Sequence, residues 1–213
     1  VAVTGVQTCA LPIYQLDAQH RVTPVDYGDV CVNYWKAALP AGQAPAKLDD
    51  LAKPELAGSF VTEDPEASSP GFAFLLATIA AYGDSGWEAY WQKLRTGGVT
   101  VTSGWEEAYN TKFKAGGGDK ALVTSYASSP VAEVVFAQTP VTTPPTGVLT
   151  DGCFRQIEFA GVLNGTKVPE AAAKLVDFML SDTFQADIPL NMFVTPTRTG
   201  VTLPDVYKAN VAA

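Results

Sequence analysis

Two Ser-Ser-Pro triplets stand where a strand pattern gives way to a helical pattern. The first, at 68–70, precedes an apolar run at 71–81, and the second, at 128–130, follows an apolar stretch at 121–126. Such a triplet is typical of a helix start, with Ser69 at the N-cap and the proline at the first helical position. The free N–H groups of a helix start can bind a phosphate or another anion. Plain N-capping without a ligand is the alternative at both places.

Two aromatic residues stand next to predicted strand ends. Trp105 follows a short strand at 99–101, and Tyr126 ends the strand at 121–126. Side chains at the carboxyl ends of strands in α/β sheets line the ligand crevice. An aromatic face there attracts a flat cation, with about 0.5–2 kcal/mol for each contact. Core packing is the alternative, and it is the better interpretation of three aromatic residues inside one predicted helix, Trp87, Tyr90 and Trp91.

The residues offer little for catalysis. The one histidine, His20, leaves HExxH and Ser-His-Asp arrangements without their histidines. The sequence contains neither a CxxC motif nor a GxxxxGK[ST] motif. Its carboxylates are scattered as on a solvated helix face. We therefore expect no catalytic residues, no cofactor and no metal site.

The composition is that of an ordinary globular protein. Of the 213 residues, 47% are hydrophobic and 17% are charged, and the formal net charge is −8. An acidic surface argues against nucleic acid as a partner and is compatible with a cationic ligand. The longest apolar run, at 71–81, is too short to span a membrane and predicts a buried helix.

Strand patterns alternate with helical patterns along the chain. Strands are predicted at 22–35, 59–62, 99–101, 121–126 and 154–163. Helices are predicted at 47–57 with a proline interruption, from Ser69 to Gly83, and at 87–94 and 104–114. A further helix is predicted to start at 128, and two more are predicted at 168–180 and 181–188. This alternation predicts an α/β fold with a largely parallel sheet.

The first residues have the sequence of a DNA-sequencing adapter in translation. Residues 3–13, VTGVQTCALPI, match the adapter's codons in order, so we expect residues 1–13 to be non-native and Cys9 to be uninformative. A short apolar strand is the alternative. We also expect that the native protein is truncated before Tyr14 and again after Ala213.

Six segments resemble the thiamine-binding periplasmic proteins in order and spacing. They are VDYGDVCVNY (25–34), EDPEASSPGFAFLLATIAAYG (63–83), VTVTSGWEEAY (99–109), LVTSYASSPVAEV (122–134), FRQIEFAGVL (154–163) and NMFVTPTRTGVTLP (191–204). The combination of SxPG after Asp-Pro, VTxGWxEAY and SYxxSP is specific for that family. DPxxSxPG alone occurs across binding proteins for iron and other solutes.

The resemblance implies a two-lobed, type II-like periplasmic-binding-protein fold that closes on its ligand. Residues 14–34 and 145–213 would form part of lobe I with the crossing strands, and 35–144 would form lobe II. The opening strands of lobe I would be missing. Because each lobe supplies part of the ligand contact, we expect this chain as it stands to bind its ligand weakly.

The same resemblance assigns ligand contacts by motif position. Ser68 and Ser69 would meet the phosphate or hydroxyethyl end of the ligand. Trp105 would lie against the ligand, and Tyr126 would contact its pyrimidine end. Phe193 would also contact the ligand, at a position where the family often has tryptophan.

A disulfide is expected from the same comparison. With Cys9 set aside, Cys31 and Cys153 form an even pair. Each lies on a predicted crossing strand, and these strands are neighbours in the resembled fold. Exported proteins form disulfides, which predicts a Cys31–Cys153 bridge, with two buried free thiols as the alternative.

The resemblance implies a solute-binding subunit of an ABC importer that captures thiamine or a thiamine phosphate. Its partners would be the membrane permease and the ATPase subunit. Its location would be periplasmic or extracytoplasmic, with lipid anchoring left open. A binding protein for another small solute, such as an iron complex or a polyamine, is the first alternative. An enzyme that reuses the same lobes is the second.

Overall fold

The computed structural model describes residues 21–40 and 43–212, which form two compact units. Unit 1 holds residues 21–28 and 156–209, and unit 2 holds residues 29–155 and 210–212. The prediction that residues 1–13 are non-native and the single histidine both lie outside the described residues. The assignment of 14–34 and 145–213 to lobe I and of 35–144 to lobe II stays a prediction.

Unit 2 is built on a mixed sheet in the order β3-β2-β4-β1-β5. Its strands are β3 (Thr100–Thr102), β2 (Phe60–Glu63), β4 (Leu122–Tyr126), β1 (Val22–Trp35) and β5 (Thr146–Gly161), the last two of which also contribute residues to unit 1. β2 runs parallel to β3 and β4, whereas β1 runs antiparallel to β4. The predicted α/β class is confirmed. The expectation of a largely parallel sheet is wrong beyond the three short strands, because the long strand β1 pairs antiparallel with β4.

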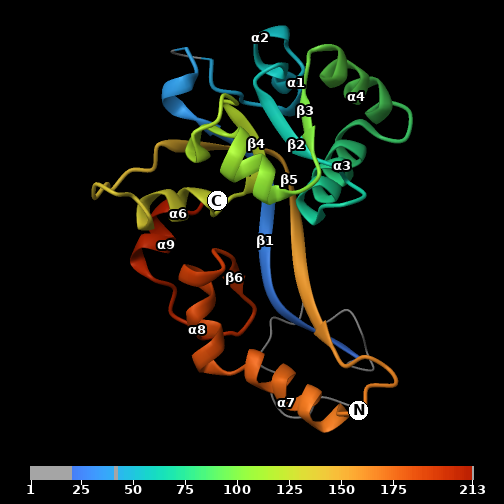
Figure 1. Ribbon diagram of the computed structural model, residues 1–213, viewed down its shortest axis with the longest axis vertical. Coiled ribbons are helices and arrows are strands. Elements are labelled where there is room, and N and C mark those ends of the chain that lie inside the picture. Colours follow the sequence, from blue (N-terminus) through green and yellow to red (C-terminus); the bar gives the residue numbers. More distant parts are fainter. Residues whose placement is uncertain (1–20, 41–42, 213) are drawn as a thin grey trace. The chain divides into compact units, whose positions relative to one another are not determined.

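Alternating side chains along these strands supply two apolar faces. Phe60 and Leu122 lie in one buried cluster with residues of α3 (Ser69–Tyr82) and α4 (Trp87–Thr96). These two helices lie together on one side of β2 and β3 (Figure 1). Val61 and Val123 lie in a second cluster, with residues of the helical segment that follows β3. The sheet of unit 2 is therefore covered on both faces.

The helical segment after β3 differs from the regular helix predicted at 104–114. It consists of α5 (Trp105–Glu107), a π-helical turn η4 (Ala108–Lys112) and a 3₁₀ turn η5 (Lys114–Gly116). The aromatic rings at 105, 109 and 113 pack in succession along it, with centroid separations of 4.9 and 5.3 Å. Tyr109 and Phe113 also lie in the buried cluster of Val61 and Val123, and this packing against the sheet overrides the local α-helical pattern.

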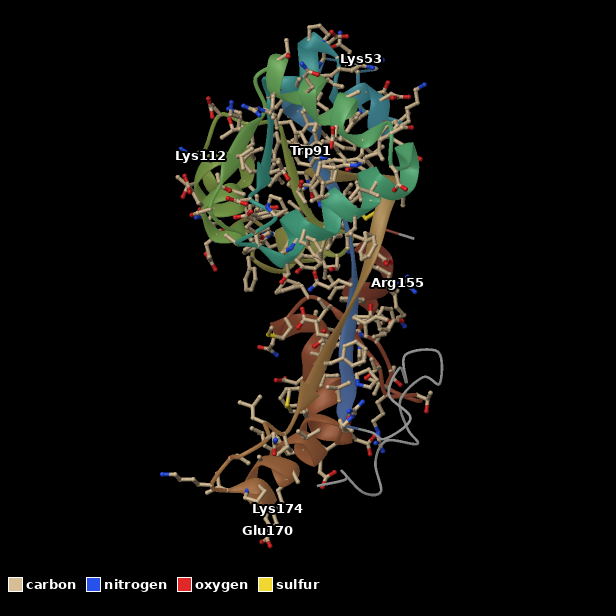
Figure 2. All side chains as sticks on the ribbon, turned by 90° about the vertical axis from the view of Figure 1, so that its right-hand side faces the viewer. Lys53, Trp91, Lys112, Arg155, Glu170 and Lys174 are labelled. Atoms are coloured by element: carbon tan, nitrogen blue, oxygen red, sulfur yellow. A yellow bond between two sulfur atoms is a disulfide. The ribbon has the colours of Figure 1, made fainter. Side chains whose placement is uncertain are left out.

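The remaining elements of unit 2 are short. They are η3 (Lys36–Ala38), α1 (Leu48–Leu51), α2 (Pro54–Ala57) and α6 (Ser129–Val135). In Figure 2, Trp91 projects into the packed interior, whereas Lys53 and Lys112 lie at the surface. β5 begins eight residues before the strand predicted from 154, because the neighbouring β1 supplies backbone partners that a local pattern does not reveal.

The predicted disulfide is confirmed. Cys31 on β1 and Cys153 on β5 are bonded, with their Cα atoms 4.5 Å apart. Both residues belong to unit 2. The bridge joins two strands that are neighbours in the sheet.

Unit 1 packs helices against the first part of β1. Its further elements are α7 (Pro169–Met179), α8 (Asp182–Asn191), β6 (Thr195–Pro196) and most of α9 (Asp205–Asn210). Val25, Ile188 and Val194 form its buried cluster. The fully buried Gln185 donates to the carbonyl oxygens of Val25 and Met179, each at 2.8 Å, so it ties α8 to the strand. Among the described helices, none is long and apolar enough to cross a membrane.

Candidate ligand-binding site

The carboxyl ends of β2, β3 and β4 meet at one edge of the sheet in unit 2. Glu63 at the end of β2 pairs with Thr102 at the end of β3, and the N–H of Asp64 donates to the Thr102 carbonyl oxygen at 2.8 Å. Helices α3, α5 and α6 each begin within a few residues of these strand ends. In α/β sheets this edge is the usual position of a ligand site.

Trp105 and the end of β4 are brought together at this edge. The indole N–H of Trp105 donates to Ser125 Oγ at 2.9 Å, and that oxygen shares a 2.8 Å hydrogen bond with Ser129 Oγ. The backbone N–H of Tyr126 donates to the same Ser129 oxygen at 3.2 Å. The half-exposed ring of Trp105 stacks on Tyr109, with centroids 4.9 Å apart and planes 18° apart. As predicted, Trp105 opens a helix and Tyr126 ends a strand.

Both Ser-Ser-Pro triplets open helices, but the N-cap is the first serine of each triplet. Ser68, and not Ser69, caps α3, and its hydroxyl accepts a 3.4 Å hydrogen bond from the Gly71 N–H. Ser69 becomes the first helical residue and is exposed. At α6 the N-cap is Ser128, while the hydroxyl of Ser129 turns inward to the network of Trp105. The hydroxyls of Ser68 and Ser129 therefore each form a hydrogen bond within the protein.

A buried carboxyl group lies at the same edge. Glu63 is fully buried, and within the described part of the chain neither of its carboxyl oxygens has a hydrogen-bond partner. Burial raises the pKa of this carboxyl to about 8. The side chain is therefore mainly protonated and uncharged at neutral pH.

The glycine that follows the first triplet is required by close packing against this strand end. A Cβ atom at Gly71 would lie 2.5 Å from the carbonyl oxygen of Glu63. Only a residue without a side chain lets the first turn of α3 approach β2 this closely.

Tyr109, the ring on which Trp105 stacks, is held in place by its own hydrogen bond. Its hydroxyl donates to Glu133 Oε1 at 2.6 Å. Burial, together with the charge of Glu133, raises the pKa of Tyr109, so the phenol remains a neutral donor. Tyr109, Ser125 and Glu63 are contributors that the sequence patterns did not single out. Ser125 and Glu63 each carried a signal, because each lies two residues after a buried valine of its own strand, Val123 or Val61, and so faces the same side of the sheet as that valine.

Phe193 belongs to unit 1. It follows α8 and has a φ of 54°, the left-handed region that bulky side chains rarely adopt. Its side chain is half-buried. Such backbone conformations cluster at binding sites, because the surrounding structure must hold them.

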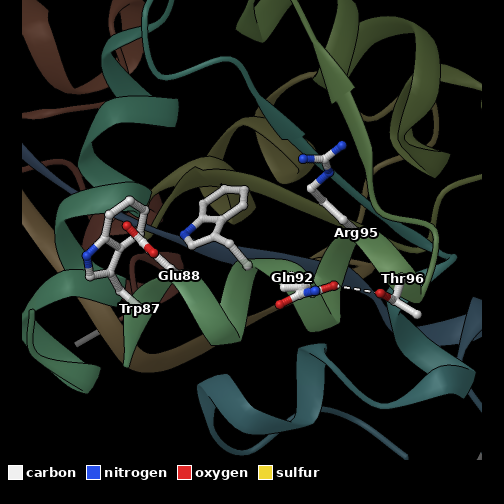
Figure 3. A pocket seen from close by; sticks show the side chains of 6 residues that line it. Trp87, Glu88, Gln92, Arg95 and Thr96 are labelled. Carbon is white, nitrogen blue, oxygen red and sulfur yellow. Dashed lines mark hydrogen bonds between the residues drawn. The ribbon is translucent and has the colours of Figure 1, made fainter. Parts of the chain in front are cut away.

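A separate surface hollow runs along α4 (Figure 3). It is lined by Trp87, Glu88, Trp91, Gln92, Arg95 and Thr96. The hydroxyl of Thr96 donates to the Gln92 carbonyl oxygen at 2.8 Å. Core packing is confirmed for Tyr90 and Trp91, whereas Trp87 is half-exposed at this hollow. All six lining residues come from α4, so this hollow does not combine residues from several strand ends as the sheet edge does.

Within residues 21–40 and 43–212, no three His, Cys, Asp or Glu side chains lie close enough together to hold a metal ion.

Comparison with known proteins gives one consistent result. The family model described as bacterial extracellular solute-binding protein matches residues 8–212. A thiamine-binding periplasmic protein of Escherichia coli is 35% identical over 181 residues, which are 85% of this chain and 53% of that protein. Its counterpart in Salmonella typhimurium is 34% identical over 186 residues, 87% of this chain and 54% of that protein. The chain thus spans about half the length of the curated relatives it matches.

Solved structures agree on the fold. A periplasmic thiamin binding protein superposes with a TM-score of 0.82 and 29% identity, covering 98% of this chain and 62% of that one. Iron-bound HitA from Pseudomonas aeruginosa superposes with a TM-score of 0.75 at 18% identity, covering 94% and 63%. The type II-like periplasmic-binding-protein fold and the resemblance to thiamine-binding periplasmic proteins are confirmed.

Proposed function

This chain belongs to the bacterial extracellular solute-binding protein family, and we propose that it captures thiamine for an importer. The observation that carries the proposal is the half-exposed Trp105 ring, stacked on Tyr109 at the carboxyl edge of three parallel strands. Thiamine combines a flat pyrimidine with a cationic ring, and both are attracted to an aromatic face. The net charge of −8 adds a favourable long-range attraction for a cation.

The residues divide the ligand between them. Trp105 stacks on one ring, and Tyr126 at the end of β4 meets the pyrimidine. Ser68 and Ser69, at the start of the 14-residue helix α3, face the hydroxyethyl end or its phosphate ester, where the helix dipole favours an anion. For Phe193, which belongs to unit 1, a ligand contact stays a prediction from the family resemblance. The named activity of the relatives supports this choice of ligand.

The wider role is inferred from the family. The family and the periplasmic location named for the relatives support placing the chain outside the cytoplasm as the solute-binding subunit of an ABC importer. Its partners are a membrane permease and an ATPase. Thiamine phosphates are accepted through the same helix start, and no catalytic step is assigned.

The test is a titration followed on the four tryptophans of the chain. Labelling with ¹⁵N-tryptophan gives one indole N–H resonance for each, assigned by single Trp→Phe variants. Thiamine should shift the Trp105 resonance saturably and leave the resonance of Trp87 on α4 unchanged. Thiamine monophosphate should act on the same resonance.

Ferric citrate and spermidine are the competing ligands. A saturable response to either of them, with none to millimolar thiamine, would replace the proposal by the corresponding solute. Release of a chemically changed product during incubation with thiamine would replace it by an enzymatic role.

A further inference from the structure

We propose that Ser125 and Ser129 are positioning residues that fix the ring of Trp105 for the ligand. This inference rests on the proposed function, because it concerns the orientation of the ligand-stacking ring. Ser125 comes from β4 and Ser129 from the first turn of α6, whereas Trp105 opens α5. Three elements thus converge on one indole N–H group.

The three side chains form a short chain of hydrogen bonds, and the donor and the acceptor of its first bond are fixed by chemistry. An indole N–H can only donate, so Ser125 Oγ must accept at the 2.9 Å contact with Trp105. Ser125 still has its own proton to donate, and Ser129 Oγ lies 2.8 Å away. Ser129 also accepts the backbone N–H of Tyr126 at 3.2 Å, which anchors the chain to the end of β4.

Burial makes this network rigid. Ser125 is fully buried and Ser129 is only 6% exposed, so water does not compete for their hydroxyls. If Ser125 lacked its oxygen, the partly buried indole N–H would lose its acceptor. An unsatisfied buried donor is costly, so the ring would rotate toward solvent to recover a partner.

The two contacts of Trp105 fix different motions of the ring. Stacking on Tyr109, with planes 18° apart, sets the tilt of the ring plane. The bond to Ser125 sets the rotation within that plane, because it pins the N–H edge. A ring held in both respects meets a flat ligand without first losing rotamer freedom, which favours binding.

The same unit contains a matched control. The indole N–H of Trp91 also donates to a hydroxyl, Thr78 Oγ1, at 2.9 Å. Thr78 is fully buried in α3, and Trp91 packs against the core cluster of α3 and α4. This pair has the same chemistry, but it lies outside the edge where the strand ends meet.

The experiment compares Ser125→Ala, Ser129→Ala and Thr78→Val on ¹⁵N-tryptophan-labelled protein. Without ligand, Ser125→Ala should move the Trp105 indole resonance upfield and speed its hydrogen exchange, while Trp91 stays in place. Ser129→Ala should give a smaller change of the same sign. Thr78→Val should move only the Trp91 resonance. An unmoved Trp105 resonance in Ser125→Ala overturns the proposal whether or not thiamine binds.

Thiamine titration supplies the second readout. We expect Ser125→Ala to raise the Kd about fivefold, the scale of one hydrogen bond, and Thr78→Val to leave it unchanged. Equal Kd values for wild type and Ser125→Ala would overturn the positioning role. If Ser125→Ala lost its backbone spectrum, Ser129→Ala would decide alone, since its loss breaks the second bond of the same chain. Absence of any thiamine response in wild type would refute the proposed function separately.

Discussion

Cys31 and Cys153 are joined across neighbouring strands β1 and β5, although 122 positions separate them in sequence. Closing so long a loop restricts the unfolded chain strongly. We expect the Cys31→Ala/Cys153→Ala variant to lose about 2–5 kcal/mol of unfolding free energy, measured by urea denaturation. The comparison is made in a Cys9→Ala background, so that no spare thiol can exchange.

Thiol counting checks the same bridge directly. The chain has three cysteines and two of them are bonded, so unfolded oxidised protein should show one free thiol. Reduction should raise the count to three. Three reactive thiols before reduction would contradict the bridge.

Replacing Trp105 by alanine should weaken thiamine binding about tenfold or more, the effect of losing one good stacking contact of about 1.4 kcal/mol. Trp87→Ala is the matched control, because Trp87 is also half-exposed but lines the hollow on α4. Calorimetry with thiamine measures both variants. A Kd equal to that of wild type in Trp105→Ala would return Trp105 to a purely structural role.

Glu63 should make stability fall as the pH rises from about 4.5 to about 8. The buried carboxyl keeps its proton up to a pKa of about 8, whereas in the unfolded chain it loses the proton near 4.5. Between these values the folded state binds more protons, so the unfolding free energy decreases by up to about 1.4 kcal/mol per pH unit. Above pH 8 both states are ionised and the loss is complete.

The variant Glu63→Gln should remove this part of the pH dependence. It should match wild type near pH 4.5 and exceed it by about 3–5 kcal/mol near pH 8, because glutamine does not ionise. Urea unfolding at several pH values measures the difference. Glu66→Gln, on an exposed loop, controls for the change in net charge. Parallel curves for wild type and Glu63→Gln would show that Glu63 is not held protonated.

Local signals in the sequence were enough to place most of the candidate site. Ser-Ser-Pro marks a helix start through its hydroxyl and its proline, and both triplets open helices. The exact cap could not be predicted, since Ser68 and Ser69 are chemically equal and only the approach of α3 to β2 selects the first. The positions of Trp105 and Tyr126 at element ends were likewise local information.

The parts that escaped prediction depend on contacts between distant segments. Ser125 matters because α5 delivers an indole N–H to it, and Glu63 because its strand pairs with β3 and packs closely against the start of α3. The antiparallel pairing of β1 with β4 joins segments about 90 residues apart, for example Asn33 with Val123. Periodicity within one segment does not contain these relationships.

Substituting Gly71 by alanine should destabilise unit 2 by about 1–3 kcal/mol, because the new Cβ would press on the Glu63 carbonyl oxygen. Gly104→Ala is the matched control. Gly104 lies at the same edge with an extended backbone, and its Cβ would meet nothing within 4 Å. Thermal unfolding should separate the two variants, and equal melting temperatures would contradict the packing argument.

The close approach of Gly71 to the Glu63 carbonyl oxygen also affects how the results of a genetic selection on this protein should be interpreted. In a library selected by growth for the proposed thiamine capture, almost every codon except glycine would disappear at position 71, just as most substitutions disappear at a ligand contact. The cause would be a lower amount of folded protein, with the recognition surface intact. Measuring abundance alongside growth would distinguish the two, since depletion at the exposed Ser69, a proposed ligand contact, should leave abundance unchanged, whereas depletion at Gly71 should follow abundance.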